Sequence, residues 1–452
     1  HGNSSFKNQV YVDHIGSMRL LTFSEEDDMS GMKRNVILAL AAALAAPSAF
    51  ATNGYFQHGY GVKSQGMAGA GVALAQDSLA AATNPAGMVM VGNRWDLGVT
   101  AFQPNRDTSV TGPTAATYDP NKDDLFFIPE FGYNTMLDSK SSFGVSVYGN
   151  GGMNTSYKTP ISLFSSSAGA NATNAGVDLS QLFIAPTMAW KLSDAHAVGV
   201  SVNFAYQRFK ATGLQNFNNT TQSTDPANVT DRGYDDATGW GARIGWVGKM
   251  SPTVTLGATY QTETNMSKFS KYAGLFAEQG NFDIPSTYAV GIAVKATPAT
   301  VIAFDIQEIK YTDSKAVSNP LGPVTAGGVL TNKLGANNGA GFGWEDITVM
   351  KLGVSHQVDS NLTVRAGWNH GDQPIPADQT FFNLLAPGVM EDHVTIGATW
   401  KTGKNEEVSA MFMHALNNKV NGSSSISPFF GGGEANLEMD QNSLGITYGK
   451  TF

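Results

Sequence analysis

Apolar side chains recur at every second position over most of the chain from Arg94 onward, which is the period of a β-strand. In the stretch 198–206, Val, Val, Val, Phe and Tyr alternate with Gly, Ser, Asn and Ala. The chain is therefore predicted to be all-β, with one apolar and one polar face on each strand. This pattern alone leaves open whether the apolar face points inward, as in a soluble barrel, or outward, as in a membrane barrel.

The lengths of the connections favour the membrane barrel. Short turns such as Asp138-Ser139-Lys140 and Thr297-Pro298 alternate strictly with long loops. Short turns at one end, long loops at the other and an even strand count are typical of an outer-membrane barrel with transmembrane antiparallel strands. We expect fourteen strands, near 94–103, 124–137, 141–149, 178–192, 195–210, 238–250, 252–266, 281–296, 299–312, 344–357, 361–372, 389–401, 406–416 and 438–452.

Composition excludes several other classes of protein. There is no Cys, so neither a disulfide scaffold nor a Cys-based metal site is possible. A net charge of −9 and a pI near 5.4 argue against a nucleic-acid partner. No run of about 18 apolar residues exists, which argues against a helical membrane span.

The N-terminus has the features of a targeting segment. Residues 32–51 contain a basic start, an apolar run and a small-residue site at Ala49-Phe50-Ala51, as in a secretory signal peptide. Residues 1–31 carry acidic residues in front of this signal, so we expect them to be a non-native or mis-started leader. The mature chain would begin at Thr52 and be exported, with the outer membrane of a Gram-negative cell as its location.

Aromatic residues fit that location. The tryptophans lie toward strand ends, where indole rings would form two girdles at the membrane–water interfaces. The final strand ends in Phe452, which resembles the signal that the barrel-assembly machinery reads in outer-membrane proteins. Outer-membrane lipid and lipopolysaccharide are then the expected surroundings. The tryptophans are Trp95, Trp190, Trp240, Trp246, Trp344, Trp368 and Trp400.

Residues 52–93 do not alternate and are rich in Gly and Ala. Fourteen strands enclose a lumen wider than their own side chains fill. We therefore expect this segment to be a hatch, or plug, inside the lumen of a barrel formed by 94–452. A periplasmic tail is the alternative.

Several motifs resemble the FadL/TodX outer-membrane transporters. The run 66–77 with Asn84-Pro85-Ala86 looks like the N-terminal hatch of that family, and 148–154, 182–190, 284–288, 343–346 and 365–368 are similar to its strand motifs. The family carries long-chain fatty acids and hydrophobic aromatic compounds. The resemblance implies passive uptake through a plugged barrel with a lateral exit. It makes Asn84, Pro85 and Ala86 the hatch motif and Gly149, Asn150, Gly151 and Gly152 a kink in the third strand. An ordinary loop start is the alternative for these four residues.

Two long loops are more apolar than a hydrophilic channel requires. In the fourth, Phe269, Tyr272 and Phe276 have the spacing of a short amphipathic helix, and Leu275 widens its apolar edge. Together with Phe381, Phe382, Leu384 and Leu385 of the sixth loop, they are candidates for hydrophobic ligand capture, although the same face would also suit packing between loops. Lys268, Lys271 and Arg365 are candidate contacts for a ligand carboxylate, and Lys295 and Arg243 share the polar face.

The principal alternative function is a general or substrate-selective porin for small hydrophilic solutes. A porin needs an open, wet lumen, which the hatch-like segment and the apolar loops argue against. An enzyme is not expected, because no G-x-S-x-G or H-E-x-x-H motif is present. No cofactor and no metal site is expected either.

Overall fold

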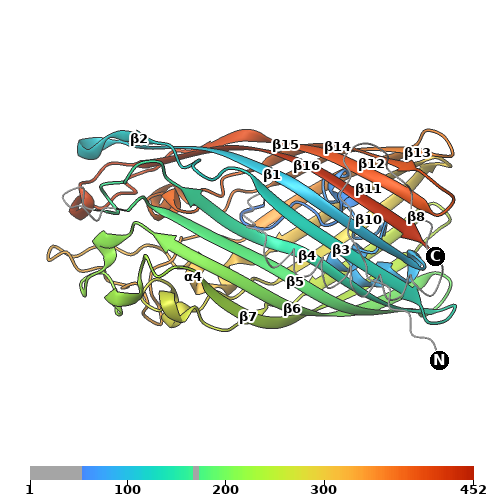
Figure 1. Ribbon diagram of the computed structural model, residues 1–452, viewed down its shortest axis with the longest axis horizontal. Coiled ribbons are helices and arrows are strands. Elements are labelled where there is room, and N and C mark those ends of the chain that lie inside the picture. The colour runs from blue at the N-terminus through green and yellow to red at the C-terminus, as the bar shows by residue number, and fades with distance from the viewer. Residues whose placement is uncertain (1–52, 166–172) are drawn as a thin grey trace, which may run out of the picture. The chain divides into compact units, whose positions relative to one another are not determined.

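Fourteen antiparallel strands form a closed barrel in the computed structural model, which describes residues 53–165 and 173–452 (Figure 1). Each strand pairs with its neighbours in sequence order, and β16 pairs with β1 over the whole of β1 to close the sheet. The strands are β1 (Arg94–Val110), β3 (Phe126–Met136), β4 (Ser141–Ser156), β5 (Gly176–Lys191), β6 (His196–Thr212), β7 (Asp235–Lys249), β8 (Val254–Gln261), β10 (Thr287–Thr297), β11 (Thr300–Ile309), β12 (Ile347–Gln357), β13 (Leu362–Gly371), β14 (Asp392–Lys401), β15 (Glu406–Val420) and β16 (Ala435–Thr451).

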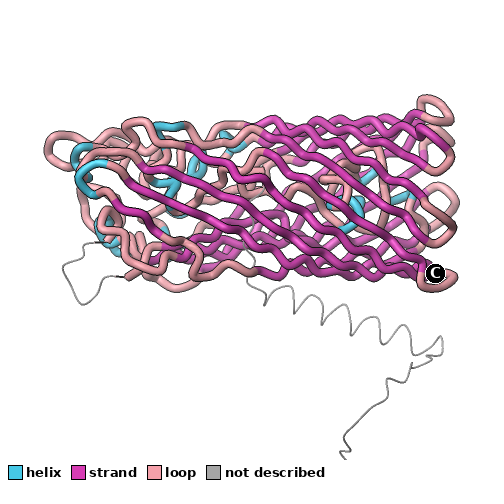
Figure 2. Tube along the Cα trace, turned by 90° about the horizontal axis from the view of Figure 1, so that it is seen from above, coloured by secondary structure: helices cyan, strands magenta, loops and turns pink. Residues whose placement is uncertain are grey.

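Two further short strands extend this sheet. β2 (Ala116–Tyr118) pairs with the end of β1, and β9 (Asn265–Met266) pairs with β7. The short turns lie at the end that holds the C-terminus, and the long loops lie at the opposite end (Figure 2). We call these the short-turn end and the long-loop end.

The apolar face of each strand points out of the barrel. On β6, Val200, Val202 and Phe204 are exposed, whereas Ser201 and Asn203 between them are fully buried. A soluble barrel would show the reverse arrangement. The outward apolar face therefore settles the question that the alternation had left open.

The predicted strands are confirmed in number and order, but several run further than their alternation indicated. β1 continues to Val110, β15 to Val420, and β16 begins at Ala435. The seventh predicted strand, in contrast, ends at Gln261 and resumes only as β9. The inward residues of these extensions include Val110, Val420, Ala435 and Leu437, which belong to one buried apolar cluster together with loop residues.

Pro186 lies within β5 and interrupts its ladder with β6. The pairing passes from Ile184↔Phe204 to Thr187↔Ser201, while Pro186 remains opposite Val145 of β4. Proline has no N–H to donate, so the missing bond lies on the β6 side.

Helices are short and lie in the plug segment and the long loops (Figure 2). Within the described ranges, none is long and apolar enough to cross a membrane. The plug segment holds α2 (Val62–Gln65), η1 (Ala80–Ala82) and η2 (Pro85–Met90). The loops hold η3 (Gly112–Thr114), η4 (Gln215–Phe217), η5 (Pro226–Asn228), η6 (Ser270–Tyr272), α3 (Ala277–Gly280), η7 (Tyr311–Asp313), α4 (Lys315–Ser318), η8 (Ala377–Gln379), η9 (Phe382–Leu384) and η10 (Pro428–Phe430).

Residues 53–93, which we call the plug segment, are almost all buried and contact the inner wall of the barrel. In Figure 1 they are the blue ribbon among the strands of the short-turn half. The expected leader (1–31), the signal peptide (32–51) and Thr52 lie outside the described residues.

Candidate plug and ligand passage

Carboxylates on the barrel wall hold the plug segment by its backbone. Asp305 on β11 accepts hydrogen bonds from two consecutive plug amides, Gly71 N at 2.7 Å and Val72 N at 3.0 Å. Glu130 on β3 accepts likewise from Gly61 N and Val62 N, and Asp96 on β1 accepts from Ser78 N. Charge-assisted bonds of this kind are stronger than neutral ones, so three separate strands fix the position of the plug.

The predicted hatch motif lies against β6 and β7. Asn84 caps η2, because its Oδ1 accepts the Ala86 N–H at 3.1 Å. Its Nδ2 donates to Val72 O at 2.7 Å within the plug and to Trp246 O at 3.0 Å on β7. This one side chain therefore shapes the plug and joins it to the wall. Its role as a moving hatch stays a prediction.

The residues predicted to kink the third strand occupy an irregular part of β4. Its register with β5 shifts between Gly149 and Gly151, which is a β-bulge. The ladder between β3 and β4 runs only from Met136↔Ser142 to Phe131↔Val147. Beyond Val147, β4 is no longer paired with β3.

Plug residues take the place of β3 along this part of β4. Gly152 N donates to Tyr55 O at 3.0 Å, Gln57 N donates to Asn150 O at 3.4 Å, and Phe56 forms a bridge with Gly151. We call residues 148–152 the unpaired edge of β4. It is covered by the N-terminal part of the plug segment rather than by a barrel strand.

Arg106 closes the wall on the long-loop side of this edge. This β1 side chain is fully buried and donates to Asn154 of β4 and to Asp123 O at 2.7 Å. It also donates to Asn121 at 3.1 Å. The missing part of the β3–β4 ladder is thus bounded by the hydrogen bonds of Arg106 toward the long-loop end. Toward the short-turn end it is bounded by the paired part of β3 and β4.

The amphipathic helix predicted in the fourth loop does not form. The segment folds as η6 and α3, and within α3 Glu278 and Gln279 adopt left-handed backbone angles. The four candidate side chains are buried: Phe269, Tyr272, Leu275 and Phe276. Phe209 of β6 contacts three of their rings, with centroid distances of 4.7–5.6 Å. Helical spacing failed here because tertiary contacts, including those with Phe209, bury these side chains without a helix.

The four candidates of the sixth loop are buried as well, namely Phe381, Phe382, Leu384 and Leu385. Phe382 contacts Phe164, Phe217 and Phe342 from three other loops. Both candidate groups belong to one continuous apolar cluster. We call it the loop cluster.

The loop cluster reaches into the barrel as far as the plug. Tyr55 and Phe56 belong to it, and Tyr55 contacts Tyr311 and Trp344 with centroid distances of 5.2 and 5.9 Å. Trp344 was predicted to lie in an interfacial girdle, and this is wrong: it is 1% exposed and donates to Asn383 at 2.6 Å. It follows Gly343, just before β12, so it does not share the strand's outward face.

The three predicted carboxylate contacts do not come together. Lys268 and Lys271 are exposed in the fourth loop, where Lys268 donates to Gln279 at 3.5 Å. Arg365 lies on the inner face of β13 and donates to Gln76 of the plug at 2.8 Å and to Thr399 at 2.7 Å. Arg365 therefore joins plug to wall, and the two lysines belong to a different region.

Arg243, which was expected on the polar face, lies beside Lys351, a residue that sequence reasoning did not single out. Both are at least nine-tenths buried, and both line a narrow cavity of about 20 Å³ between plug and wall. Arg243 donates to Thr83 O at 3.0 Å, but its Nε has no partner among the described residues. The cavity also borders Tyr60 and Asp305. The alternation of β12 does indicate that Lys351 points inward. Only the register between strands, however, shows which residues it faces.

A second charged group, also not predicted, lies near the short-turn end. Lys63 of α2 forms an ion pair with Glu407 of β15, and Arg94 contacts Glu407 at 2.7 Å. Arg94 also donates to Asp96 at 2.9 Å. We call these four residues the plug ion network. Lys63 is separated from Glu407 by 344 positions, which no local motif reveals.

Two titratable side chains outside the strands have unusual environments. Burial, and secondly the positive charge of Lys351, lower the pKa of His58 in the plug to about 4. Its ring stacks on that of His393, with a centroid distance of 6.1 Å. Partial burial, and secondly Asp283, raise the pKa of Glu263 in the fourth loop to about 7. Among the residues the structure describes, no His or acidic groups are arranged to hold a metal ion.

Comparison with known proteins places this geometry in a family. Residues 38–452 match the family model described as Outer membrane protein transport protein (OMPP1/FadL/TodX). The chain is 21% identical over 430 residues to the long-chain fatty acid transport protein of Escherichia coli strain K12, covering 85% of this chain and 92% of that protein. The corresponding protein of Salmonella typhi is also 21% identical, over 419 residues and with the same coverage.

Solved structures share the fold. The toluene transporter TodX of P. putida superposes with a TM-score of 0.64 at 17% identity, covering 88% of this chain and 99% of that one. A FadL homologue of Pseudomonas aeruginosa gives 0.65 at 13% identity, with coverages of 88% and 100%. At such identities the likeness concerns the fold alone.

Proposed function

The chain belongs to the OMPP1/FadL/TodX family of outer-membrane transport proteins, and we propose that it takes up long-chain fatty acids or other hydrophobic compounds by passive passage through its plugged barrel. Its similarity to a long-chain fatty acid transport protein supports this class of substrate. Transport, rather than catalysis, is also what the family description names.

The observation that carries the proposal is the continuity of the loop cluster. Apolar side chains from the fourth and sixth loops join without a break to Tyr55 and Phe56 of the plug. An alkyl chain or aromatic ring moving inward would exchange one apolar surface for another, at about 25 cal/mol per Å² of apolar area kept from water. A hydrophilic solute would gain nothing from this route.

A fatty acid would also need a partner for its carboxylate. Arg243 and Lys351 are two buried cations at the inner end of the apolar route, and they suit this role. Their cavity is about the size of one water molecule, so a carboxylate enters only when plug residues such as Tyr60 move. Ligand binding and plug movement would therefore be coupled.

The exit we propose is lateral, through the wall between β3 and β4. The unpaired edge of β4, with Gly149, Asn150, Gly151 and Gly152, is where β4 pairs with β5 but not with β3. Movement of the plug, with Asn84, Pro85 and Ala86 as its hatch motif, would uncover this edge. Substrate would then pass into the membrane without crossing water.

The outward apolar faces contact outer-membrane lipid and lipopolysaccharide in this proposal. Phe452, which is 55% exposed, stacks on Tyr133 and donates its backbone N–H to Asn93 O at 3.1 Å. An exposed terminal aromatic on the last strand suits recognition by the barrel-assembly machinery.

A porin is the less suitable reading, because the plug segment occupies the lumen and is bonded to several strands. Uptake into liposomes tests the choice, with oleate and a small sugar offered to reconstituted protein. We expect oleate flux that falls when Arg243 and Lys351 are both replaced by Gln, and stays unchanged in the exposed pair Lys268→Gln/Lys271→Gln. Sugar flux without oleate flux would support the porin instead.

A further inference from the structure

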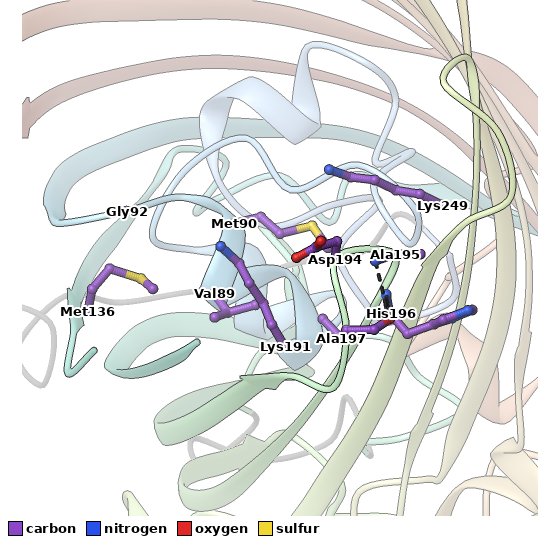
Figure 3. A pocket seen from close by; sticks show the side chains of 11 residues that line it. Val89, Met90, Gly92, Met136, Lys191, Asp194, Ala195, His196, Ala197 and Lys249 are labelled. Atoms are coloured by element: carbon purple, nitrogen blue, oxygen red, sulfur yellow. Dashed lines mark hydrogen bonds between the residues drawn. The ribbon is translucent and has the colours of Figure 1, made fainter. Parts of the chain in front are cut away.

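A cavity of about 350 Å³ opens at the short-turn end, beside the last residues of η2, the helix that begins in the hatch motif. It is separate from the Arg243–Lys351 cavity. Figure 3 shows it from close by, with Lys191 and Lys249 on different sides of it. We call it the short-turn cavity. Its volume lies within the usual range for small-molecule sites, about 300–1,000 Å³.

The floor of the short-turn cavity is apolar. Val89 and Met90, at the end of η2, and Met136 of β3 line it. Val89 also packs with Ala86 of the hatch motif in a small cluster of buried apolar residues. The cavity floor is thus continuous with the hatch, so any displacement of η2 changes the cavity.

Two lysines provide positive charge above this floor. Lys191 and Lys249 fall on the same strand faces as the buried Ala189 and Val247, so they belong to the inner wall and not to the lipid-facing side. Within the described residues, neither ammonium group has an ion-pair partner. Asp194 lines the cavity as well, but it forms no ion pair with either lysine in that part of the chain.

His196 is the remaining titratable residue of the lining. Its ring stacks on Trp246, with a centroid distance of 5.8 Å and an interplanar angle of 20°. Val198, the next residue on the same face of β6, belongs to the outward series. His196 therefore borders the cavity from the rim, and the two lysines dominate its charge.

We propose that the short-turn cavity is a binding site for the carboxylate and adjoining methylene groups of a single-chain fatty acid that has passed the plug. The cations match the head group, and the floor of Val89, Met90 and Met136 matches the start of the chain. Since the lysines are on the inner wall, the ligand arrives from the barrel interior. The site gives an anionic substrate an axial exit at the short-turn end, beside the lateral one. This inference rests on the proposed transport function.

Photolabelling tests the site directly. Dodecanoate with a diazirine beside its carboxylate is added to the full chain in phosphatidylcholine nanodiscs, and labelled peptides are mapped by mass spectrometry. We expect labels on 188–197 and 88–92. Replacing both lysines, Lys191→Gln/Lys249→Gln, is expected to reduce this labelling about tenfold, because each lost charge-assisted bond weakens binding. The pair Lys191→Arg/Lys249→Arg should restore it.

The control pair is Lys295→Gln/Lys401→Gln, two lysines of the same barrel end that do not line the cavity. Labelling of 188–197 and 88–92 in this control variant should equal that in the unchanged protein. Equal labelling in the Lys191→Gln/Lys249→Gln variant would overturn the proposal, as would equal competition by neutral dodecanol. Competition by phosphatidic acid in the nanodisc, but not by free dodecanoate, would reassign the cavity to a lipid headgroup and overturn it too.

The outcome is separable from that of the transport proposal. If the unchanged protein moves no oleate into liposomes, the transport function fails whatever the labelling shows. If it moves oleate while labelling of 188–197 ignores both lysines, only the short-turn site fails.

Discussion

The side-chain oxygen of Asn84 occupies the space in which a Cβ atom of Gly245 would stand. A Cβ atom on the adjacent Gly199 of β6 would likewise collide with the backbone of Pro85. Two glycines on neighbouring strands thus form a bare part of the wall into which the hatch motif fits. Because a side chain at either glycine would displace the hatch motif, a substitution there tests the role of the motif directly.

We expect Gly245→Ala to displace Asn84 and to lower oleate uptake severalfold, while the barrel still assembles. An added methyl in a filled space costs about 1–3 kcal/mol, and here the plug is the part that gives way. Gly403→Ala, in a turn where a Cβ meets only ordinary contacts, is the control. Unchanged uptake in Gly245→Ala would show that the assignment of Asn84 to the hatch motif is wrong.

Breaking the plug ion network should loosen the plug. In Lys63→Met, Glu407 keeps only Arg94, and the plug loses its ion pair with the wall. We expect about 1–3 kcal/mol less stable seating, visible as more frequent open events in planar-bilayer conductance. Lys419→Met, from an exposed pair at 3.7 Å, should leave conductance as it was.

Acid should loosen the plug through His58. Its pKa is about 4 when seated and about 6.5 when exposed, so a released plug binds a proton that the seated plug does not. Seating is therefore unaffected above pH 6.5 and weakens as the pH falls from 6.5 to 4, by on the order of 3 kcal/mol in total. Burial and, secondly, the positive charge of Lys351 cause this low pKa, and the ring of His393 stacks on that of His58.

Conductance measured between pH 7.5 and 4 checks this dependence. His58→Gln should flatten the rise between pH 6.5 and 4, whereas the exposed His356→Gln should not. A rise of the same size in both variants would assign the effect to the wall carboxylates instead.

The loop cluster should matter for hydrophobic substrates alone. Phe382→Ala removes a ring that contacts three other loops, with an expected loss of about 3–5 kcal/mol in loop stability. Oleate uptake should fall while folding of the barrel, read from its heat-modified migration in SDS gels, persists. Phe429→Ala, a change at a 54% exposed ring beside Phe430, is the matched control. Equal uptake by both variants would count against the apolar route.

Alternation and turn residues were sufficient to predict the barrel, because each strand meets lipid on one face and polar groups on the other. The same reasoning failed where tertiary contacts replace that environment. The spacing of Phe269, Tyr272 and Phe276 predicted a helix, but these rings are buried by Phe209 without one. Trp344 was likewise expected in an interfacial girdle, but it is buried in the interior.

The charged groups of the interior were the least predictable part of the site. Arg243 and Lys351 carry inward parity, which is readable, but the register across five strands decides that they share a cavity. Lys63 and Glu407 meet only because the plug folds back into the barrel. Neither pairing has a local signature in the sequence.

The unpaired edge of β4 has a consequence for how the protein stays sealed. Tyr55, Phe56 and Gln57 substitute for the missing stretch of β3, so the plug segment completes the sheet at this point. Withdrawing these residues would unblock the lumen and breach the wall in the same motion. A leak through the lumen alone or through the wall between β3 and β4 alone is then disfavoured. The same three plug residues keep both routes closed in an empty transporter.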